Sequence, residues 1–364
     1  MPEVRIHPVE LPFPPPSHNP LQDRILPPTL EWGRRVALIG STAAENRLRR
    51  GGYAAMIALW APTIVDLPRL SLLTDWTLWY GVLDDQIDEA SAGLHPDRLA
   101  ELFQTLRRIT HHDNPEPAPA GPTTTALADL WHRTTPGTPF FWQQRLREDL
   151  SSILTGSLRA ATHRATQAPM DIATCVQVGN ATRGMRLLHD LQHRIHNLYL
   201  PDIVHATTPY QTMLTAVENY TSINNDLVSY EREAAFGELQ NLAIILQRTH
   251  RWTPQQAIDH LTEQSGQQIQ DYLAAERALI SLTRALRLPA DVIDSTEQAI
   301  HLMRALLHGG HAWHWGSDRY QHGTDITANL HSLEDSFCLG LPGTPSPAPR
   351  PQPQRTGEIR DSRD

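Results

Sequence analysis

Apolar residues recur at intervals of three and four along most of the chain, which is the spacing of one face of an α-helix. Alternating β-branched runs are few, and no Asn-Gly or Asp-Gly hairpin turn occurs. We predict seven long helices: Leu67–Ala90, Pro96–Thr110, Phe140–Thr166, Ile172–Leu198, Gln211–Ala235, Pro254–Leu286 and Ala290–Trp315. No internal repeat is visible, so the pattern favours an all-α bundle over a solenoid.

The 29 prolines gather near the two ends of the chain and in one internal stretch, and they leave a body suited to helices. We therefore predict a proline-rich arm over residues 1–29, a single helical domain over residues 30–336 and a disordered Pro/Arg-rich tail over residues 337–364. The internal stretch His111–Pro122 is expected to be a connecting loop.

Composition narrows the class of protein. The 364 residues carry a net charge of −9, which argues against sequence-independent binding of nucleic acid. No stretch reaches the roughly 18 apolar residues of a membrane span, and no apolar signal core is present, so we expect a soluble, cytoplasmic protein. The two cysteines, Cys175 and Cys338, exclude a disulfide scaffold and a cysteine-based metal cluster. Every basic residue is arginine, which excludes Schiff-base catalysis by lysine.

The first candidate site is a carboxylate cluster at the end of an apolar helix. Asp84 and Asp88 are four residues apart, so they share one helix face, with Asp85 beside them. Like charges are unfavourable there, because the helix dipole is also negative at the C-terminal end. Oxygen ligands without Cys or clustered His indicate a hard cation such as Mg²⁺. Alone, the cluster is equally consistent with a solvated helix end.

A second polar cluster strengthens this interpretation. Asn225, Ser229 and Glu233 lie at positions i, i+4 and i+8, so they form one stripe about 12 Å long on a helix. An amide carbonyl, a hydroxyl and a carboxylate are three further oxygen ligands for a hard cation. Near the C-terminus, Arg319 can grip a phosphate with two N–H groups, and the phenol of Tyr320 can donate to it. Together the clusters indicate a metal-dependent site.

In this order the three motifs resemble those of the bacterial class I terpene synthases, the terpenoid cyclases. The family's hallmarks are D-D-x-x-D, N-D-x-x-S-x-x-(K/R)-E and a late Arg-Tyr pair, and the similarity runs from Leu30 to Tyr320. The resemblance implies a single-domain helical bundle around a central apolar cavity. It also implies a Mg²⁺-dependent lyase, with three ions, that ionises farnesyl diphosphate and releases diphosphate and a cyclic sesquiterpene. Relatives are often dimers, so a homodimer stays open.

The resemblance assigns roles to individual residues. The Mg²⁺ ligands would be Asp84, Asp85, Asp88, Asn225, Ser229 and Glu233, with Asp85 paired to an arginine in the closed state. The residues with the most direct part in catalysis would be Asp84, Asn225, Glu233, Arg319 and Tyr320. The diphosphate would be bound by Arg232, Arg319 and Tyr320, joined by Arg183 or Arg186.

One segment departs from the family. The family usually carries Arg-Arg-x-Thr-x-Gly, whose arginine senses the diphosphate, whereas residues 179–184 are Gly-Asn-Ala-Thr-Arg-Gly. Gly179 and Asn180 therefore stand at the two arginine positions, and Arg183 or Arg186 is available as a substitute. The departure leaves open a catalytically impaired relative that binds a prenyl diphosphate without converting it.

A carbocation needs an apolar cavity with aromatic walls. The predicted lining is Trp76, Trp79, Tyr80, Gly184 and Trp313. Geranyl and geranylgeranyl diphosphate remain alternative substrates, which would make the protein a monoterpene or diterpene cyclase. Chain-elongating prenyl transfer is disfavoured, because the second cluster is not another D-D-x-x-D.

Histidines form two further groups at helical spacing. His189, His193 and His196 could bind a transition metal, although a polar helix face is the favoured interpretation. A second group near the C-terminus, His308, His311 and His314, is expected to line a groove or to be solvated.

Overall fold

The computed structural model describes residues 4–88, 91–111, 121–236 and 240–317. All regular secondary structure in these ranges is helical, which confirms the predicted all-α class. The elements are α1 (Gln22–Arg35), α2 (Thr42–Arg50), α3 (Tyr53–Trp60), α4 (Leu67–Asp88), the short 3₁₀ helix η1 (Ser91–Leu94), α5 (Pro96–His111), α6 (Pro122–Thr134), α7 (Phe140–Thr166), α8 (Ile172–Thr182), α9 (Met185–His196), α10 (Asp202–His205), α11 (Thr208–Phe236), α12 (Leu242–His250), α13 (Pro254–Ala285) and α14 (Ala290–Gly316).

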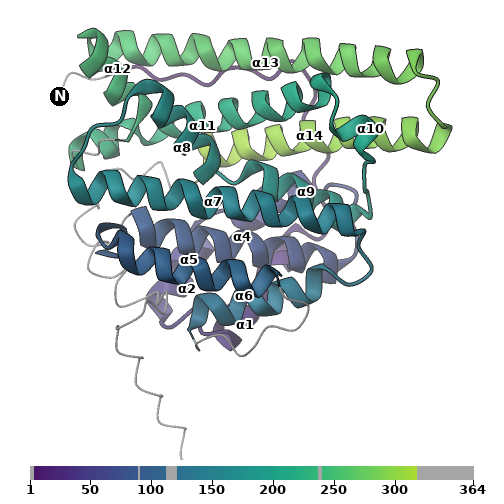
Figure 1. Ribbon diagram of the computed structural model, residues 1–364, viewed down its shortest axis with the longest axis horizontal. Coiled ribbons are helices and arrows are strands. Elements are labelled where there is room, and N and C mark those ends of the chain that lie inside the picture. Colours follow the sequence, from purple (N-terminus) through teal and green to yellow (C-terminus); the bar gives the residue numbers. More distant parts are fainter. Residues whose placement is uncertain (1–3, 89–90, 112–120, 237–239, 318–364) are drawn as a thin grey trace, which may run out of the picture.

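The longest helices lie in stacked rows (Figure 1). Helix α13 packs along α11, and α14 packs against α3, while α7 contacts both α5 and α8. One large apolar core surrounds α4 and includes the fully buried Trp60, Trp76 and Trp142. A smaller core lies between α8, α11, α12 and the start of α13. None of the described helices is both long and apolar enough to span a bilayer.

Six of the seven predicted helices are confirmed within a few residues, and the seventh is wrong as a single element. The predicted helix Ile172–Leu198 is divided into α8 and α9 at Gly184, whose φ is +63°. Glycine adopts this left-handed conformation without the steric cost of a Cβ. The break leaves Arg183 at the C-terminal cap of α8 and turns the chain at the centre of the bundle.

The N-terminal arm is shorter than predicted. Helix α1 begins at Gln22, inside the expected arm, and it contains Pro27 and Pro28. Burial of Ile25 and Leu30, neither of which is exposed at all, outweighs the poor helix propensity of the prolines. Sequence reasoning also missed α2, α3, α6, α10 and α12. The predicted loop His111–Pro122 lies mostly outside the described residues.

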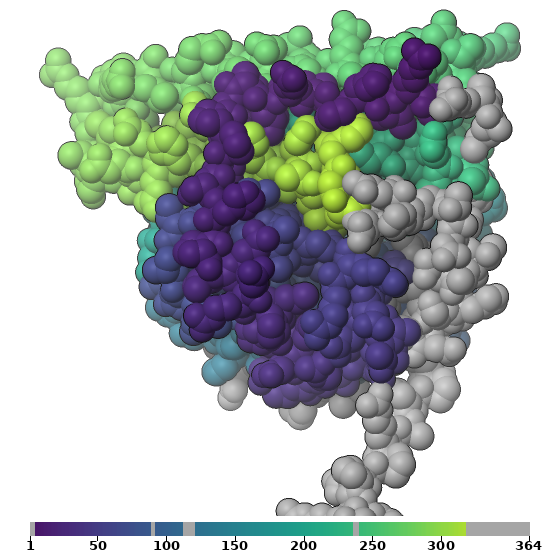
Figure 2. Space-filling model, turned by 180° about the vertical axis from the view of Figure 1, so that it is seen from behind, coloured from purple at the N-terminus to yellow at the C-terminus, as the bar shows by residue number. Residues whose placement is uncertain are grey.

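The rest of the arm runs over the back of the molecule, beside α13 and then down across α14 (Figure 2). The backbone N–H of Arg5 donates to Gln255 Oε1 at 2.9 Å, and Gln255 Nε2 donates to the Arg5 carbonyl at 3.0 Å. Further along, the Phe13 ring meets the His308 ring edge to face, with centroids 5.0 Å apart. The arm is therefore bound along its length to the two C-terminal helices.

Candidate active site

The first acidic motif lies in the last turn of α4. Asp85 is buried, Asp84 is half-buried and Asp88 is exposed, so the three side chains range from the core to the surface. Two arginines from other helices compensate their charge. Arg47 of α2 donates to Asp85 Oδ2 from Nη2 at 3.0 Å and from Nε at 3.2 Å. Arg164 of α7 donates to Asp88 Oδ1 at 3.2 Å and to the Ile87 carbonyl at 3.0 Å.

These contacts supply the positive partners that the sequence predicts for the carboxylates but does not identify. Carboxylates at a helix C-terminus need positive partners, and the structure supplies Arg47 and Arg164. Both donating nitrogens of Arg47 meet the same oxygen of Asp85, and the pairing of Asp85 with an arginine in a closed state stays a prediction. Neither arginine could be found from the motif, because each belongs to an element distant in sequence.

The second motif lies on α11, where its polar groups are tied into the fold. The Ser229 hydroxyl donates to the Asn225 carbonyl at 2.7 Å, and the Asn225 amide lies 3.5 Å from His314 Nε2 of α14. Glu233 Oε2 accepts from Asn241 Nδ2 at 2.9 Å. Asn241 is the N-cap of α12, so this helix start is linked directly to the motif.

Asp226, which follows the first residue of this motif, holds the start of α12. Its Oδ2 accepts from the backbone N–H of Leu242 at 3.0 Å, and its carbonyl accepts from Asn241 at 2.7 Å. A carboxylate at a helix N-terminus is favourable, because unpaired N–H groups and the positive end of the dipole meet there. Asp226 and Asn241 are thus site residues that sequence reasoning did not assign.

Arg183 lies between the two acidic motifs. Its Nη2 is 3.4 Å from Asp226 Oδ1. Burial lowers the pKa of its guanidinium, but the carboxylates of Asp226, Asp84, Asp88 and Glu233 outweigh burial, and the net shift is upward. Two motifs separated by most of the domain therefore act on one arginine, at the break between α8 and α9.

Arg183 has an unfilled hydrogen-bonding capacity. Its Nε is buried and has no hydrogen-bond partner within the described part of the chain, and its ion pair with Asp226 is long. An unpaired buried donor is costly, and a bound anion would remove that cost. The geometry makes Arg183 a ready binding group for a phosphate.

Arg186 faces a different set of residues. It forms an ion pair with Glu218 of α11 at 2.8 Å, and it also donates to Gln211 and Thr215. Of the two arginines proposed as substitutes, the structure therefore places Arg183 among the acidic motifs and Arg186 away from them.

The substituted positions have structural roles of their own. A Cβ on Gly179 would lie 2.6 Å from Ser222 Oγ, so α8 and α11 approach each other too closely there for a long side chain. Asn180 donates to Asn219 Oδ1 at 2.6 Å and faces α11. Neither position points a charged group at the acidic motifs.

The aromatic residues of α4 that were predicted to line the cavity lie in two different environments. Tyr80 lies at the helix break, where a Cβ on Gly184 would be 3.4 Å from its ring. Trp76 and Trp79 are fully enclosed, and their indole N–H groups donate to Thr134 Oγ1 at 2.8 Å and to the Thr123 carbonyl at 3.1 Å. These contacts anchor α4 to α6, and the cavity-lining role of both tryptophans stays a prediction.

The predicted residues nearer the C-terminus lie on or beyond α14. Trp313 donates to the Gly51 carbonyl at 2.6 Å and stacks with Tyr53, with ring centroids 6.1 Å apart. Arg319 and Tyr320 lie outside the described residues. Arg232 is half-buried and lowers the pKa of the adjacent Glu233.

The donor groups fit hard divalent cations. The two motifs offer carboxylate, amide and hydroxyl oxygens, and Mg²⁺ prefers oxygen ligands. Burial raises the pKa of Glu233 to about 7, and the neighbouring Asp226 carboxylate adds to the rise, while Asn241 and Arg183 oppose it. A cation bound here would favour the charged carboxylate and relieve this cost.

An all-helical bundle in which two motifs of oxygen ligands lie near one half-buried arginine is typical of enzymes that bind a diphosphate through metal ions. A family model described as terpene synthase family 2, C-terminal metal binding, matches residues 75–271. A pentalenene synthase from Streptomyces avermitilis is 30% identical over 85% of this chain and 91% of its own length. The chain belongs to the bacterial class I terpene synthase family, and it is a terpene synthase.

Two further comparisons agree with this assignment. A (−)-β-caryophyllene synthase from Saccharothrix espanaensis, named as (2E,6E)-farnesyl diphosphate cyclizing, is 24% identical over 85% of this chain and 87% of its own. The structure of a hedycaryol synthase in complex with HEPES superimposes with a TM-score of 0.74, at 25% identity, over 86% of this chain and 99% of that one.

Proposed function

We propose that this terpene synthase converts farnesyl diphosphate, in the presence of Mg²⁺, to a cyclic sesquiterpene with release of diphosphate. The chain length is supported by the Saccharothrix espanaensis relative, whose name gives farnesyl diphosphate as its substrate. The metal requirement is supported by the metal-binding family model and by the oxygen donors of both motifs. We propose three ions as the full complement.

The proposed ligands are the outer carboxylates of α4 and the polar stripe of α11. They are Asp84, Asp88, Asn225, Ser229 and Glu233. Asp85 supports this set through its pair with Arg47. When bound, the cations would supply Lewis-acid stabilisation of the charge that develops on the departing diphosphate.

The observation that carries the proposal is the position of Arg183 between the two motifs. The guanidinium offers an unused buried N–H and only a long contact to Asp226, so an arriving diphosphate can engage it at little cost. We propose that Arg183 takes the part of the family arginines that Gly179 and Asn180 replace. Arg232, Arg319 and Tyr320 are proposed to bind the same group.

Tyr80 and Gly184 extend the site from the charged end toward the apolar interior. Tyr80 lies one turn before Asp84 on α4 and touches the backbone turn at Gly184, where Ile153 also packs. An aromatic ring beside aliphatic groups excludes water and can stabilise a carbocation through its π face. We propose that this wall is the part of the apolar cavity closest to the diphosphate.

The test is incubation of the purified protein with geranyl, farnesyl and geranylgeranyl diphosphates separately, with and without Mg²⁺, followed by gas chromatography with mass detection. Asp84→Asn should abolish product, and Asp97→Asn, at an exposed aspartate on α5, should not. A cyclic product from farnesyl diphosphate alone supports the proposal, and one from another chain length reassigns the substrate. No product from any substrate, with the protein folded, would indicate an impaired relative.

A further inference from the structure

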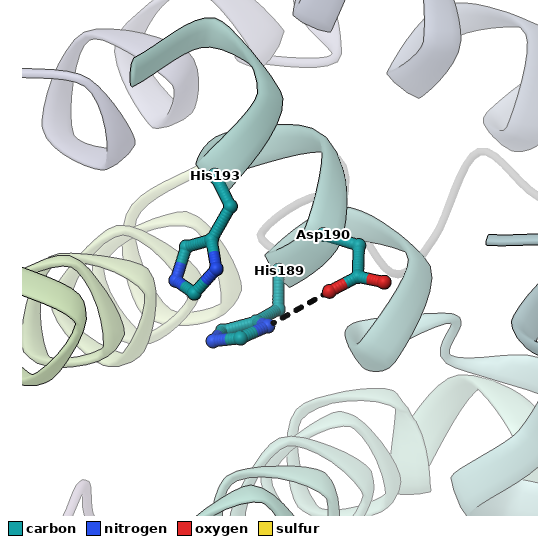
Figure 3. A group of neighbouring side chains, drawn as sticks. All are labelled: His189, Asp190 and His193. Carbon is teal, nitrogen blue, oxygen red and sulfur yellow. Dashed lines mark ion pairs between the residues drawn. The ribbon is translucent and has the colours of Figure 1, made fainter. Parts of the chain in front are cut away.

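A buried group of metal-ligating side chains lies on α9, apart from the acidic motifs. His189, Asp190 and His193 have exposures of 1%, 3% and 3%. One nitrogen or oxygen from each lies within 4.8 Å of the others. Figure 3 shows the two imidazoles one turn apart on the helix, with their rings tilted relative to one another and the carboxylate beside them. Their ring centroids are 4.0 Å apart.

Two atoms of this group lack the partners that buried polar atoms normally have. His193 Nε2 and Asp190 Oδ2 are buried and have no hydrogen-bond partner within the described ranges. Native proteins leave few such atoms unsatisfied, and an ion or a water molecule commonly explains those that remain. His189 Nδ1 and Asp190 Oδ1 are 3.6 Å apart, which is too long for a hydrogen bond. A metal ion about 2 Å from each atom would fit between them.

The other nitrogen of His189 already has the partner that a metal-binding imidazole uses. His189 Nε2 lies 3.0 Å from the hydroxyl of Tyr210, in the first turn of α11. If Nε2 carries the proton and donates it to the phenol oxygen, Nδ1 presents its lone pair toward Asp190. Ligating histidines commonly donate their second N–H to an oxygen in this way, which fixes the tautomer and the ring orientation.

The local charge also accommodates a cation. Asp149, Asp190 and Glu218 lie near one another, together with Arg145 and Arg186. Three carboxyl groups thus face two guanidinium groups, one of which is paired with Glu218. Burial lowers the pKa of the His189 and His193 imidazoles and raises that of the Asp190 carboxyl.

We propose that His189, Asp190 and His193 bind one transition-metal dication, with Zn²⁺ the best match, at a site separate from the acidic motifs. Two imidazoles and a carboxylate suit Zn²⁺, Co²⁺ or Ni²⁺, whereas Mg²⁺ prefers oxygen ligands alone. The site binds α9 to the start of α11 through Tyr210. It therefore stabilises the segment that follows the helix break at Gly184.

The test uses the full chain, stripped with a chelator and titrated with Co²⁺ in a large excess of Mg²⁺. The excess of Mg²⁺ occupies the acidic motifs, and nitrogen-ligated Co²⁺ of low coordination number absorbs visible light more strongly than an octahedral all-oxygen site. We expect one equivalent of Co²⁺, displaced by Zn²⁺, and a rise in melting temperature with either ion. If the folded wild-type protein binds neither ion beside Mg²⁺, the proposal is wrong.

Variants locate the site. His193→Gln should weaken Co²⁺ binding by more than the roughly 10- to 100-fold cost of losing a supporting partner, and Tyr210→Phe should weaken it within that range. The matched control is His196→Gln on the same helix, whose Nε2 also lacks a partner but which is not in the cluster. Unchanged Co²⁺ binding in His193→Gln, or equal losses in both histidine variants, would overturn the assignment. The metal content of the wild-type protein still decides the question if a variant fails to fold.

Discussion

Replacing Arg183 by alanine removes a guanidinium that lies near the carboxylates of both motifs. At the observed 3.4 Å, a pair of unit charges interacts by about 5 kcal/mol with an effective dielectric constant near 20, before desolvation is subtracted. Loss of one preorganised donor to a developing anion typically costs about 3 to 4 kcal/mol, or roughly 10²- to 10³-fold in turnover. We expect a loss of this size for Arg183→Ala. Arg183→Lys should lose less, because it keeps the charge but not the forked geometry.

The assay is steady-state release of diphosphate from farnesyl diphosphate at saturating Mg²⁺, with product confirmed by mass detection. Circular dichroism and the melting temperature show whether each variant is folded. Arg159→Ala is the control, because Arg159 is an exposed arginine of the neighbouring helix α7 and its guanidinium makes a long contact, 3.4 Å, to Gln177. If Arg183→Ala is folded and turns over within about threefold of the wild type, Arg183 is not the diphosphate-binding residue.

Three other changes probe the scaffold. Gly184→Ala should cost about 1 to 2 kcal/mol of stability, measured by denaturant unfolding, because its φ is +63°. Burial raises the pKa of Asp75 to about 6 from 3.8, so the stability linked to its protonation is complete below about pH 4 and lost as pH rises through 6. The free energy of unfolding of Asp75→Asn, relative to that of the wild type, should therefore rise by up to roughly 3 kcal/mol between pH 4 and pH 7.5. A difference in unfolding free energy that does not depend on pH would contradict this. Arg47→Ala should lower the melting temperature, because it removes the guanidinium that pairs with the buried Asp85, and Mg²⁺ should recover part of the loss. Arg50→Ala, at an exposed position on the same helix, should change the melting temperature little.

The sequence predicts the helices of the bundle well where apolar periodicity is strong. It predicts them less well where tertiary contacts determine which side chains are buried and which residues pair. Both motifs were found because polar side chains four residues apart on a helix share one face. The surroundings of Trp76 and Trp79 could not be predicted, since residues 73–79 of α4 are all buried, polar ones included, and periodicity then indicates no inward face. Arg47 and Arg164 were missed for a different reason. Electrostatics requires a positive partner for the aspartates, but only the fold determines which distant arginine supplies it.

The departure at residues 179–184 follows from how α8 packs. At Gly179 the helix lies so close to Ser222 of α11 that a Cβ would be 2.6 Å from the Ser222 hydroxyl, which would have to move to admit a side chain. Arg183 is four residues later, one helical turn along the same face, and it caps the helix where the chain bends at Gly184. The chain therefore keeps a close helix contact at one turn and places its guanidinium at the next, nearer the break. The break also lies beside the ring of Tyr80, one turn before Asp84, so the proposed binding group Arg183 and the proposed apolar wall adjoin at Gly184.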